Sequence, residues 1–320
     1  MEEILKGRKI NKYFLFLVVA IIFVIFPCHA ENIKSPFNGL LLDTDKDPGD
    51  YSFFVAAHLF GSTYSGGAIF PSASIQAAID MINDNSANIF IALGDIYFNA
   101  YSLRFKKFNE SFASKVNMPI FNAVGDHDVS ERALYEQYHG KTYFSFIYGK
   151  EAFIFIDTEM ENGNIKGEQL KYFKKTLQKY AKNSNIKNVF IFGHRLIWSG
   201  YKEDYSILNQ YIFADVYPFD YNFNKDIVPC LVDLSKCGKS IYWFTGDGDE
   251  DFPCVFFYAK DEQNNIQFVI TQITDTVKDA MIKVNVNKLG EVKMEAISLT
   301  RQKLLPVESY NLEYWKKYGF

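Results

Sequence analysis

The chain has 320 residues, a formal net charge of −4 at pH 7 and 48% hydrophobic residues. This length allows one large domain or two small ones, and no linker, internal repeat or low-complexity tract divides the sequence. The mild acidity and the lack of a basic patch argue against nucleic acid as a partner.

The first 30 residues have the layout of a secretory signal peptide. An uncharged apolar run of 14 residues, Tyr13 to Phe26, follows four basic residues, and small residues at Cys28 and Ala30 favour cleavage after residue 30. This predicts a secreted or periplasmic protein. An anchor formed by residues 13–26 stays open as the alternative, although a spanning helix needs about 17 to 25 residues. Membrane contact is expected only through this segment.

After the signal peptide, residues 31–50 are polar and predict an exposed lead-in to one domain at residues 51–320. Export permits a disulfide, and Cys230 with Cys237 would close a small loop. The odd number of remaining cysteines leaves one free thiol, and Cys254 has a structural setting without a neighbouring base.

From residue 51 onward, strand and helix patterns alternate, which predicts a mixed α/β sandwich. Helical spacing covers a capped segment from Pro71, residues 101–115 with Leu103, Phe108 and Phe112 facing the core, and residues 166–182. The aromatic, irregular stretch at 199–228 suggests a lid. Hairpin turns are predicted at residues 148–150, 264–265 and 289–290.

Five strand-like runs end in short phrases that each carry a His or an Asp. Their first such residues are His58, Asp95, Asp126, His194 and Asp247. Three of the four histidines after residue 30 fall in these phrases, and only His139 is left over. Ligands in open α/β sheets bind beyond the carboxyl ends of strands, so the pattern predicts one converging metal site. A single Asp after a strand is usually a turn residue, but five such ends are harder to explain that way.

In these phrases the chain resembles the calcineurin-like metallophosphoesterase superfamily, over about residues 52–300. The family pattern is D-x-H, G-D-x-x-D/N, G-N-H-D/E, a lone His and then G-H-x-H, in the same order. The resemblance implies a four-layer α/β/β/α sandwich of two mixed β-sheets flanked by helices. The flanking text is similar to exported members that resemble purple acid phosphatases.

The resemblance also implies roles for single residues. The implied metal ligands are His58, Asp95, Asp126, His194, Asp247 and Asp249. His127 matches the histidine that contacts phosphate and protonates the leaving group, and Asp128 would orient it. Arg195 would bind a phosphate oxygen. The plainer interpretations are a hydrogen-bonded turn histidine at His127 and a solvated side chain at Arg195.

The ligand set departs from the family pattern. Ala56 stands where the first metal-binding Asp is expected, and carboxylates replace the usual Asn at Asp126 and the two usual histidines at Asp247 and Asp249. Clustered carboxylates without a cation would repel one another, so bound metal is expected. Among Mn, Fe, Mg, Ca and Zn, oxygen-rich ligands favour Mn or Mg.

Two metal positions follow from this set. The tighter one would use Asp95, Asp126, His194 and Asp247, and the more labile one His58, Asp95 and Asp249. By resemblance, the protein is a metallophosphoesterase outside the cytoplasm. It would hydrolyse a phosphomonoester or phosphodiester by metal-activated hydroxide, with His127 as the acid. The alternative is a catalytically degenerate protein of this fold that serves as a binding or scaffold protein of the cell envelope, which the loss at Ala56 favours.

Overall fold

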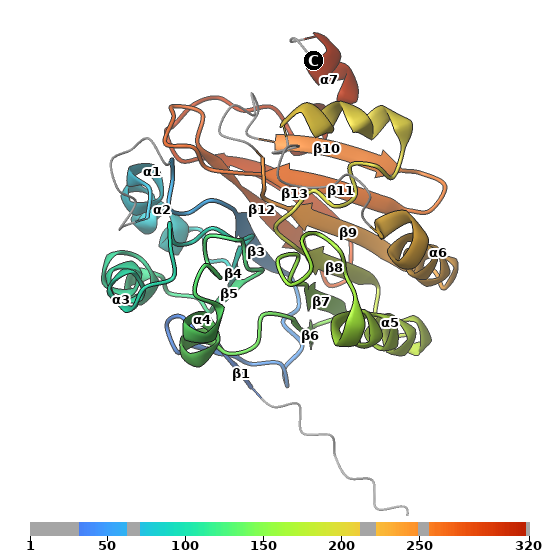
Figure 1. Ribbon diagram of the computed structural model, residues 1–320, viewed down its shortest axis with the longest axis horizontal. Coiled ribbons are helices and arrows are strands. Elements are labelled where there is room, and N and C mark those ends of the chain that lie inside the picture. The colour runs from blue at the N-terminus through green and yellow to red at the C-terminus, as the bar shows by residue number, and fades with distance from the viewer. Residues whose placement is uncertain (1–31, 63–70, 212–221, 249–255, 318–320) are drawn as a thin grey trace, which may run out of the picture. The chain divides into compact units, whose positions relative to one another are not determined.

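The computed structural model describes residues 32–62, 71–211, 222–248 and 256–317, and in this part of the chain two mixed β-sheets pack against each other (Figure 1). The larger sheet has the order β10-β11-β9-β8-β7-β6, and the smaller has the order β13-β12-β3-β4-β5. A small hairpin of β1 and β2 precedes them.

The strand bounds follow the apolar runs of the sequence. The strands are β1 (Ile33–Lys34), β2 (Leu41–Leu42), β3 (Tyr51–Ala56), β4 (Ile89–Ala92), β5 (Ile120–Asn122), β6 (Phe144–Tyr148), β7 (Glu151–Phe155), β8 (Asn188–Phe192), β9 (Ser240–Thr245), β10 (Phe256–Asp261), β11 (Ile266–Thr271), β12 (Ala280–Val286) and β13 (Val292–Ser298). β3, β4 and β5 are parallel neighbours, as are β7, β8, β9 and β11.

Helices cover the outer faces of both sheets. They are α1 (Ala73–Ala77), α2 (Ile79–Asp84), α3 (Ser102–Ser111), α4 (Arg132–His139), α5 (Gly167–Lys182), α6 (Val228–Lys236) and α7 (Leu312–Lys317). Segments of 3-10 or π-helix lie at η1 (Ala113–Lys115), η2 (Glu203–Tyr211), η3 (Phe223–Ile227) and η4 (Val307–Ser309). None of the described helices is both long and apolar enough to cross a membrane.

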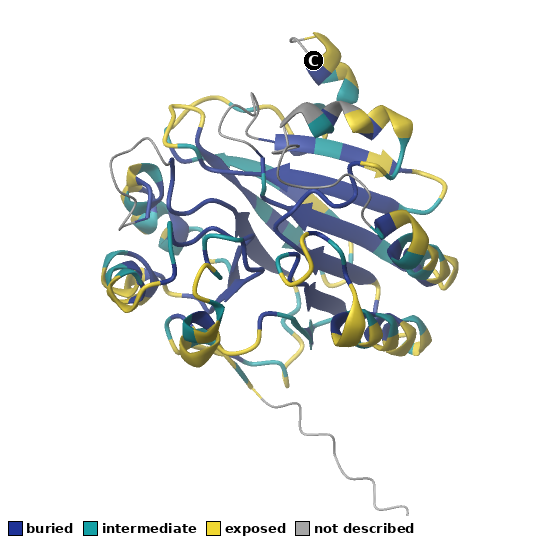
Figure 2. Cartoon of the chain, in the orientation of Figure 1, coloured by how far each residue is buried: buried dark blue, intermediate teal, exposed yellow. Residues whose placement is uncertain are grey.

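Alternating side chains of β3 build two separate apolar layers. Phe53 points between the sheets, where its ring lies 5.2 Å from that of Phe153 and 5.0 Å from that of Phe190. Phe54 points the other way, into the cluster beneath α1, α2 and α3. Because successive strand residues face opposite sides, one fully buried strand can serve both layers. Figure 2 shows the buried strands between helices whose outer faces are exposed. The predicted four-layer α/β/β/α sandwich is confirmed.

Several local predictions are confirmed and others need correction. The three hairpins form as β6–β7, β10–β11 and β12–β13, and Ser72 caps α1 through its side chain. The helix expected from Pro71 onward is interrupted at Ala78, which separates α1 from α2. The expected core position Leu103 is wrong, because this side chain is 59% exposed and Phe105 is buried instead.

The lead-in is less exposed than its polar composition predicted. Phe37 and Leu42 are buried, and the Ser35 hydroxyl donates to the carbonyl of Ile120. The predicted lid region lies partly outside the described residues, and its described part is packed, with Tyr205 and Leu208 buried.

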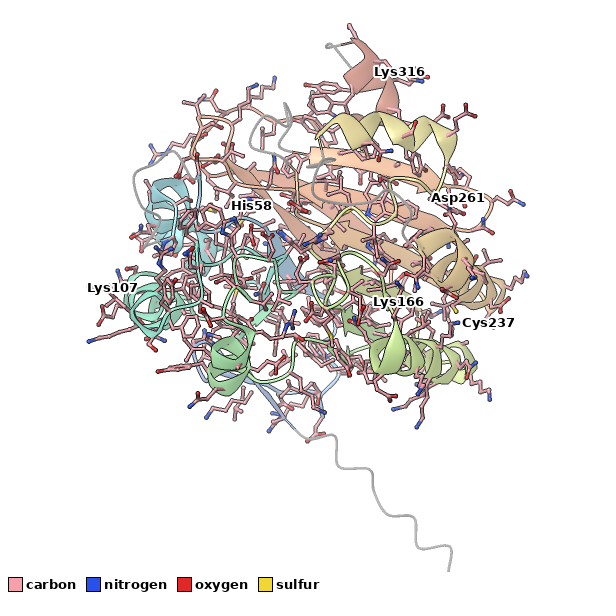
Figure 3. All side chains as sticks on the ribbon, viewed as in Figure 1. His58, Lys107, Lys166, Cys237, Asp261 and Lys316 are labelled. Atoms are coloured by element: carbon pink, nitrogen blue, oxygen red, sulfur yellow. The ribbon has the colours of Figure 1, made fainter. Side chains whose placement is uncertain are left out.

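The thiols of Cys230 and Cys237 are free, so the permitted disulfide does not form. Cys230 lies within α6, and Cys237 follows the end of that helix at the edge of the fold (Figure 3). Cys254 lies outside the described residues.

His139 has a structural role, as its leftover position in the sequence suggested. Its ring stacks on Phe37 at 4.5 Å, its Nδ1 donates to the carbonyl of Pro36, and its Nε2 accepts from the hydroxyl of Tyr97. Burial lowers the pKa of His139 to about 4, against an ordinary value of 6.5. The folded protein therefore holds this imidazole neutral.

This depressed pKa predicts a pH-dependent contribution to stability. Between pH 6.5 and 4, His139 is protonated in the unfolded chain but stays neutral in the folded chain. The free energy of unfolding therefore decreases as the pH falls from 6.5 to 4. The loss is on the order of 2 to 3 kcal/mol. We expect His139→Gln to reduce the difference in unfolding free energy between pH 7 and pH 4.5, measured by urea titration. An equal difference in both proteins would contradict this assignment.

Candidate metal centre

Five chain segments bring titratable side chains to one edge of the two sheets. His58 follows β3, Asp95 follows β4, and Asp126 follows β5 in the smaller sheet. His194 follows β8 and Asp247 follows β9 in the larger sheet. Since these five strands are parallel within their sheets, their carboxyl ends meet at the same edge. The convergence predicted from the strand ends is therefore present.

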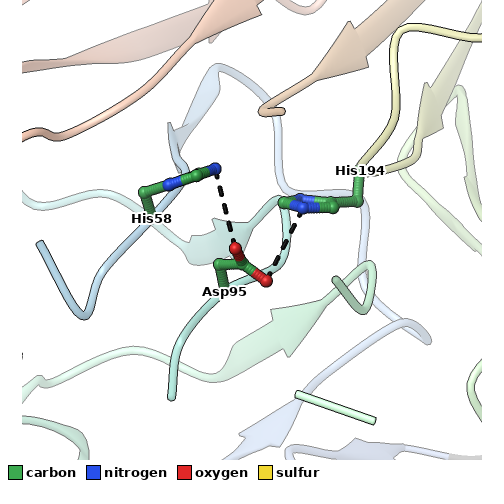
Figure 4. Close-up of side chains that lie close together, drawn as sticks. All are labelled: His58, Asp95 and His194. Atoms are coloured by element: carbon green, nitrogen blue, oxygen red, sulfur yellow. Dashed lines mark ion pairs between the residues drawn. The ribbon is translucent and has the colours of Figure 1, made fainter. Parts of the chain in front are cut away.

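Asp95 lies at the centre of the cluster, between His58 and His194 (Figure 4). Its Oδ2 is 3.7 Å from Nε2 of His58, and its Oδ1 is 3.6 Å from Nε2 of His194. The same His194 nitrogen is 3.6 Å from Oδ1 of Asp126 and 3.8 Å from Oδ1 of Asp247. The two oxygens of Asp95 thus face two different groups of ligand atoms.

Backbone contacts between the sheets fix these side chains. Nδ1 of His194 donates to the carbonyl of Leu93 at 2.7 Å, so Nε2 is turned toward Asp95. The amides of Gly246 and Asp247 both donate to the carbonyl of His194 at 3.0 Å. A second hydrogen bond of this kind is typical of metal-binding histidines, because it fixes the tautomer and the ring.

The polar atoms at the centre suit a divalent cation. Nε2 of His58, Oδ1 of Asp95 and Nε2 of His194 are buried and have no hydrogen-bond partner among the described residues. The separations of 3.6 to 3.8 Å are too long for hydrogen bonds. They are close to the spacing of about 3 to 3.5 Å between ligands that share a metal at about 2.1 Å. The His58, Asp95 and His194 ligand atoms lie within 4.8 Å of one another, and this cluster fits a metal.

The electrostatics lead to the same conclusion. Burial raises the pKa of Asp95 well above its usual range, and burial lowers the pKa of His58 to about 3. Burial alone would lower the pKa of His194, but the carboxylates of Asp95, Asp247 and Asp126 together raise it well above 6.5. Both raised pKa values mean that the buried cluster holds a proton when no cation is bound. A divalent cation would supply that positive charge instead.

Strained backbone and close glycines surround the cluster. His58 and Asp95 adopt the left-handed region, with φ of 52° and 55°. Such conformations cost of order 1 to 3 kcal/mol each and are concentrated at functional sites. A Cβ at Gly94 would lie 2.4 Å from Nδ1 of His194, and one at Gly125 would lie 2.1 Å from Oδ1 of Asp95.

Gly125→Ala should therefore disrupt the centre. The added methyl must displace the Asp95 carboxylate, so we expect Mn²⁺ affinity to fall at least about tenfold, as for other changes that misorient a ligand. Isothermal titration with Mn²⁺ measures the affinity, and circular dichroism checks folding. Gly200→Ala is the matched control, because a Cβ there meets no atom within 4 Å. Equal Mn²⁺ affinity in both variants would refute the close contact.

Comparison with known proteins places this geometry in a known fold. No protein-family model and no curated protein matches the sequence. A purple acid phosphatase from yellow lupin (Lupinus luteus) seeds superposes with a TM-score of 0.54 at 13% identity, over 80% of this chain and 53% of that one. A dimetal phosphatase from Danio rerio gives a TM-score of 0.51 at 10% identity, over 80% of this chain and 99% of that one. The chain has the metallophosphoesterase fold. It spans about half the length of the lupin phosphatase.

Within the metallophosphoesterase fold, His127 lies beside the cluster. Its Nδ1 donates to the carbonyl of Phe98 at 2.6 Å, and its ring stacks on that of Phe98. On the other side its ring is 5.1 Å from that of Phe60, which also lies 5.6 Å from the ring of His58. The hydrogen bond by Nδ1 leaves Nε2 as the nitrogen available for chemistry.

Asp128 is held differently from the orienting role that the resemblance implied. It is fully buried, and its oxygens accept from the amides of Ile96, Tyr97 and Gly125 and from the side chain of Asn122. No hydrogen bond joins it to His127 among the described contacts. Asp128 therefore fastens the loops after β4 and β5 to each other, and the Phe98 carbonyl orients His127.

The Arg195 side chain is buried, and most of its guanidinium is bound within the protein. Its side chain is 5% exposed, and Nε donates to both carboxylate oxygens of Glu159 at 2.8 and 2.7 Å. Nη2 also contacts Glu159. Glu159 accepts from the Thr158 hydroxyl as well, so this carboxylate is fully engaged. The implied phosphate-binding role of Arg195 therefore competes with a buried ion pair.

The remaining site predictions have mixed outcomes. Asp249 lies outside the described residues. Ala56 is fully buried in the apolar cluster on the helix side of β3, so it supplies no ligand. Two residues were missed, namely Glu159 and Gln272. A Cβ at Gly248 would lie 2.3 Å from Oε1 of the buried Gln272, which places this amide beside the last motif. The sequence contained one weak indication that Glu159 lies near the site, because this residue follows the end of a strand.

Proposed function

We propose that the protein is a metal-dependent phosphoesterase that acts outside the cytoplasm. The observation that carries the proposal is the placement of Asp95, whose two oxygens face His58 on one side and His194 on the other. A carboxylate in this position is suited to bridge two cations. The positions would be the predicted ones, with the His194 side tighter and with Mn or Mg favoured by the oxygen-rich ligands.

The residues would share the work as follows. When bound, divalent cations activate water and withdraw charge from a phosphoryl group. Asp95, Asp126, His194 and Asp247 would hold the tighter position, and His58 with Asp95 the other. His127 would donate a proton from Nε2 to the leaving oxygen, while the Phe98 carbonyl holds its ring. His58, Asp95 and His194 are buried, whereas Asp126 and His127 are partly exposed, so water and substrate can reach the centre from that side.

His127→Ala should separate proton donation from metal binding. We expect kcat for an alkyl phosphate such as glycerol phosphate to fall by about 10²- to 10³-fold, because an alkoxide needs a proton in order to leave and a positioned general acid contributes about that much. Metal content, measured by elemental analysis, should stay unchanged. The control is His139→Gln at pH 7, since His139 lies in the cluster around Phe37 and Tyr97. Unchanged turnover in His127→Ala would remove His127 from the mechanism.

A degenerate binding or scaffold protein of the cell envelope is the second candidate. It is favoured by one observation: Ala56 lies in an apolar cluster where the first motif lacks its carboxylate. Bound metal without turnover of phosphomonoesters or phosphodiesters, across Mn, Mg, Fe, Ca and Zn, would support this candidate over the enzyme.

A further inference from the structure

A surface cavity of about 740 Å³ has Phe60, a neighbour of His58 and His127, in its lining. It is formed by the start of α1, by the loop between β11 and β12, and by the residues that follow β13. Its lining includes Phe60, Ser74, Asp275, Thr276 and Thr300. This volume is in the range of sites for small organic ligands.

Phe60 joins the cavity to the metal centre. Phe60 lines the cavity, and its ring lies 5.6 Å from the ring of His58 and 5.1 Å from the ring of His127. The amide of Phe60 donates to the carbonyl of Asp95 at 3.2 Å, so the position of this residue is tied to the central ligand. Phe60 is therefore the residue that lies between the metal centre and the cavity.

The hydroxyl groups of the lining present acceptors. Ser74 donates its proton to Asp279, Thr300 donates to the carbonyl of Val277, and Thr276 donates to Asp279. Each hydroxyl donor is thus used within the protein. Thr276 also accepts from the amide of Lys278, and Ser74 and Thr300 pair with neighbouring serine hydroxyls, so each of these oxygens keeps at most one free lone pair. A ligand that donates hydrogen bonds or carries positive charge suits such a lining.

The lining of the cavity is also negatively charged. Among the described residues, no Lys, Arg or His lines the cavity. Asp279 is buried with both oxygens bonded, so the accessible charge is that of Asp275, which is exposed. Oδ2 of Asp275 accepts from the amide of Ser62, which holds the carboxylate at the rim near Phe60. This accessible carboxylate, in a lining without a basic side chain, suits a cationic group.

We propose that this cavity binds the leaving group of the substrate and selects alcohols that carry a positive charge. The substrate class would be phosphoesters of small amino alcohols, such as ethanolamine or choline. This inference rests on the proposed phosphoesterase function for the reaction, but the cavity's affinity for a cationic alcohol does not depend on turnover. A second anionic group on the alcohol would meet Asp275 and be rejected.

The deciding variant is Asp275→Asn. Asp275 has a φ of 54°, which Asn tolerates as well as Asp does, and the amide oxygen can still accept from Ser62. Only the charge is removed. Asp233→Asn on α6 is the matched control, because that side chain is 78% exposed and outside the cavity lining.

Two measurements test binding in the cavity separately from turnover. Ligand-observed NMR with choline chloride measures binding without turnover, and we expect affinity to fall about three- to tenfold in Asp275→Asn and to stay unchanged in Asp233→Asn. Equal affinity in wild type and Asp275→Asn, or no binding at all, would overturn the proposal. With Mn²⁺, kcat/KM should rank ethanolamine phosphate above glycerol phosphate and phosphoglycerate last. Turnover of p-nitrophenyl phosphate without this ranking would overturn the selectivity alone, whereas choline binding without any turnover would overturn the proposed reaction and support the cavity.

Discussion

Replacing Asp95 with Asn should abolish metal binding and reduce phosphoester hydrolysis by at least about 10³-fold. Asp95 is 2% exposed and is the residue whose two oxygens face both histidines. An amide has the same shape but offers one weaker oxygen ligand and no charge to balance a cation. The loss should therefore affect both metal positions at once, unlike the loss of any other ligand.

The effect of Asp95→Asn on stability should depend on metal. In the wild type without a cation, burial disfavours the Asp95 carboxylate, so the metal-free variant should be at least as stable as the metal-free wild type. Saturating Mn²⁺ should stabilise only the wild type, by about 2.7 kcal/mol at a hundredfold excess over Kd. Thermal unfolding with and without Mn²⁺ measures this crossover.

Asp261→Asn is the control for losing a buried carboxylate elsewhere. Asp261 is also 2% exposed, but it bonds to Tyr201, Lys202 and Asn264 at the end of β10. This variant should lose stability and keep both Mn²⁺ binding and turnover. If Asp95→Asn were stabilised by Mn²⁺ as much as the wild type, Asp95 would not be the central ligand.

The second large effect concerns folding. Glu159→Leu should destabilise the protein by about 3 to 5 kcal/mol, because it leaves the Arg195 guanidinium buried without its carboxylate. Both side chains are at most 5% exposed, so solvent screening does not weaken the pair. Urea unfolding at pH 7 in the absence of metal measures the change without a contribution from cations.

A double-mutant cycle distinguishes a broken ion pair from lost packing. Glu159→Leu combined with Arg195→Met removes both charges, so the double variant should be more stable than Glu159→Leu alone. The two single effects should therefore not add. Additive losses would mean that the two side chains act independently, which the hydrogen bonds between them contradict.

The sequence allowed the fold and the centre of the site to be predicted for a physical reason. Parallel buried strands place their carboxyl ends together, so His58, Asp95 and His194 could be read from apolar runs that end in a His or an Asp. The apolar run of β3 is likewise typical of a buried strand, and in the structure its side chains reach both apolar layers. Each strand end can be recognised from local sequence, and the parallel arrangement of the strands then brings these ends together.

The parts that the sequence did not predict depend on contacts between loops. Glu159 and Arg195 are 36 positions apart in the sequence. Their ion pair forms because β7 and β8, which precede them, are neighbouring strands. The sequence suggests that Asp128 orients the adjacent His127. In the structure, its oxygens instead accept hydrogen bonds from three backbone amides and from Asn122. Leu103 and Phe105 both fit a helical stripe, and only the packing of α3 decides which one is buried.

A metal-dependent phosphoesterase is tested most directly by hydrolysis of p-nitrophenyl phosphate and bis-p-nitrophenyl phosphate by the purified protein, with metal content measured on the same samples. The protein would be assayed as purified, after chelation, and after Mn²⁺ is added back. We expect bound divalent metal, loss of turnover with chelation and recovery with Mn²⁺ in the wild type, and neither metal nor turnover in Asp95→Asn. Turnover that persists in metal-free protein, or metal-loaded protein that hydrolyses neither ester, would contradict the proposed function.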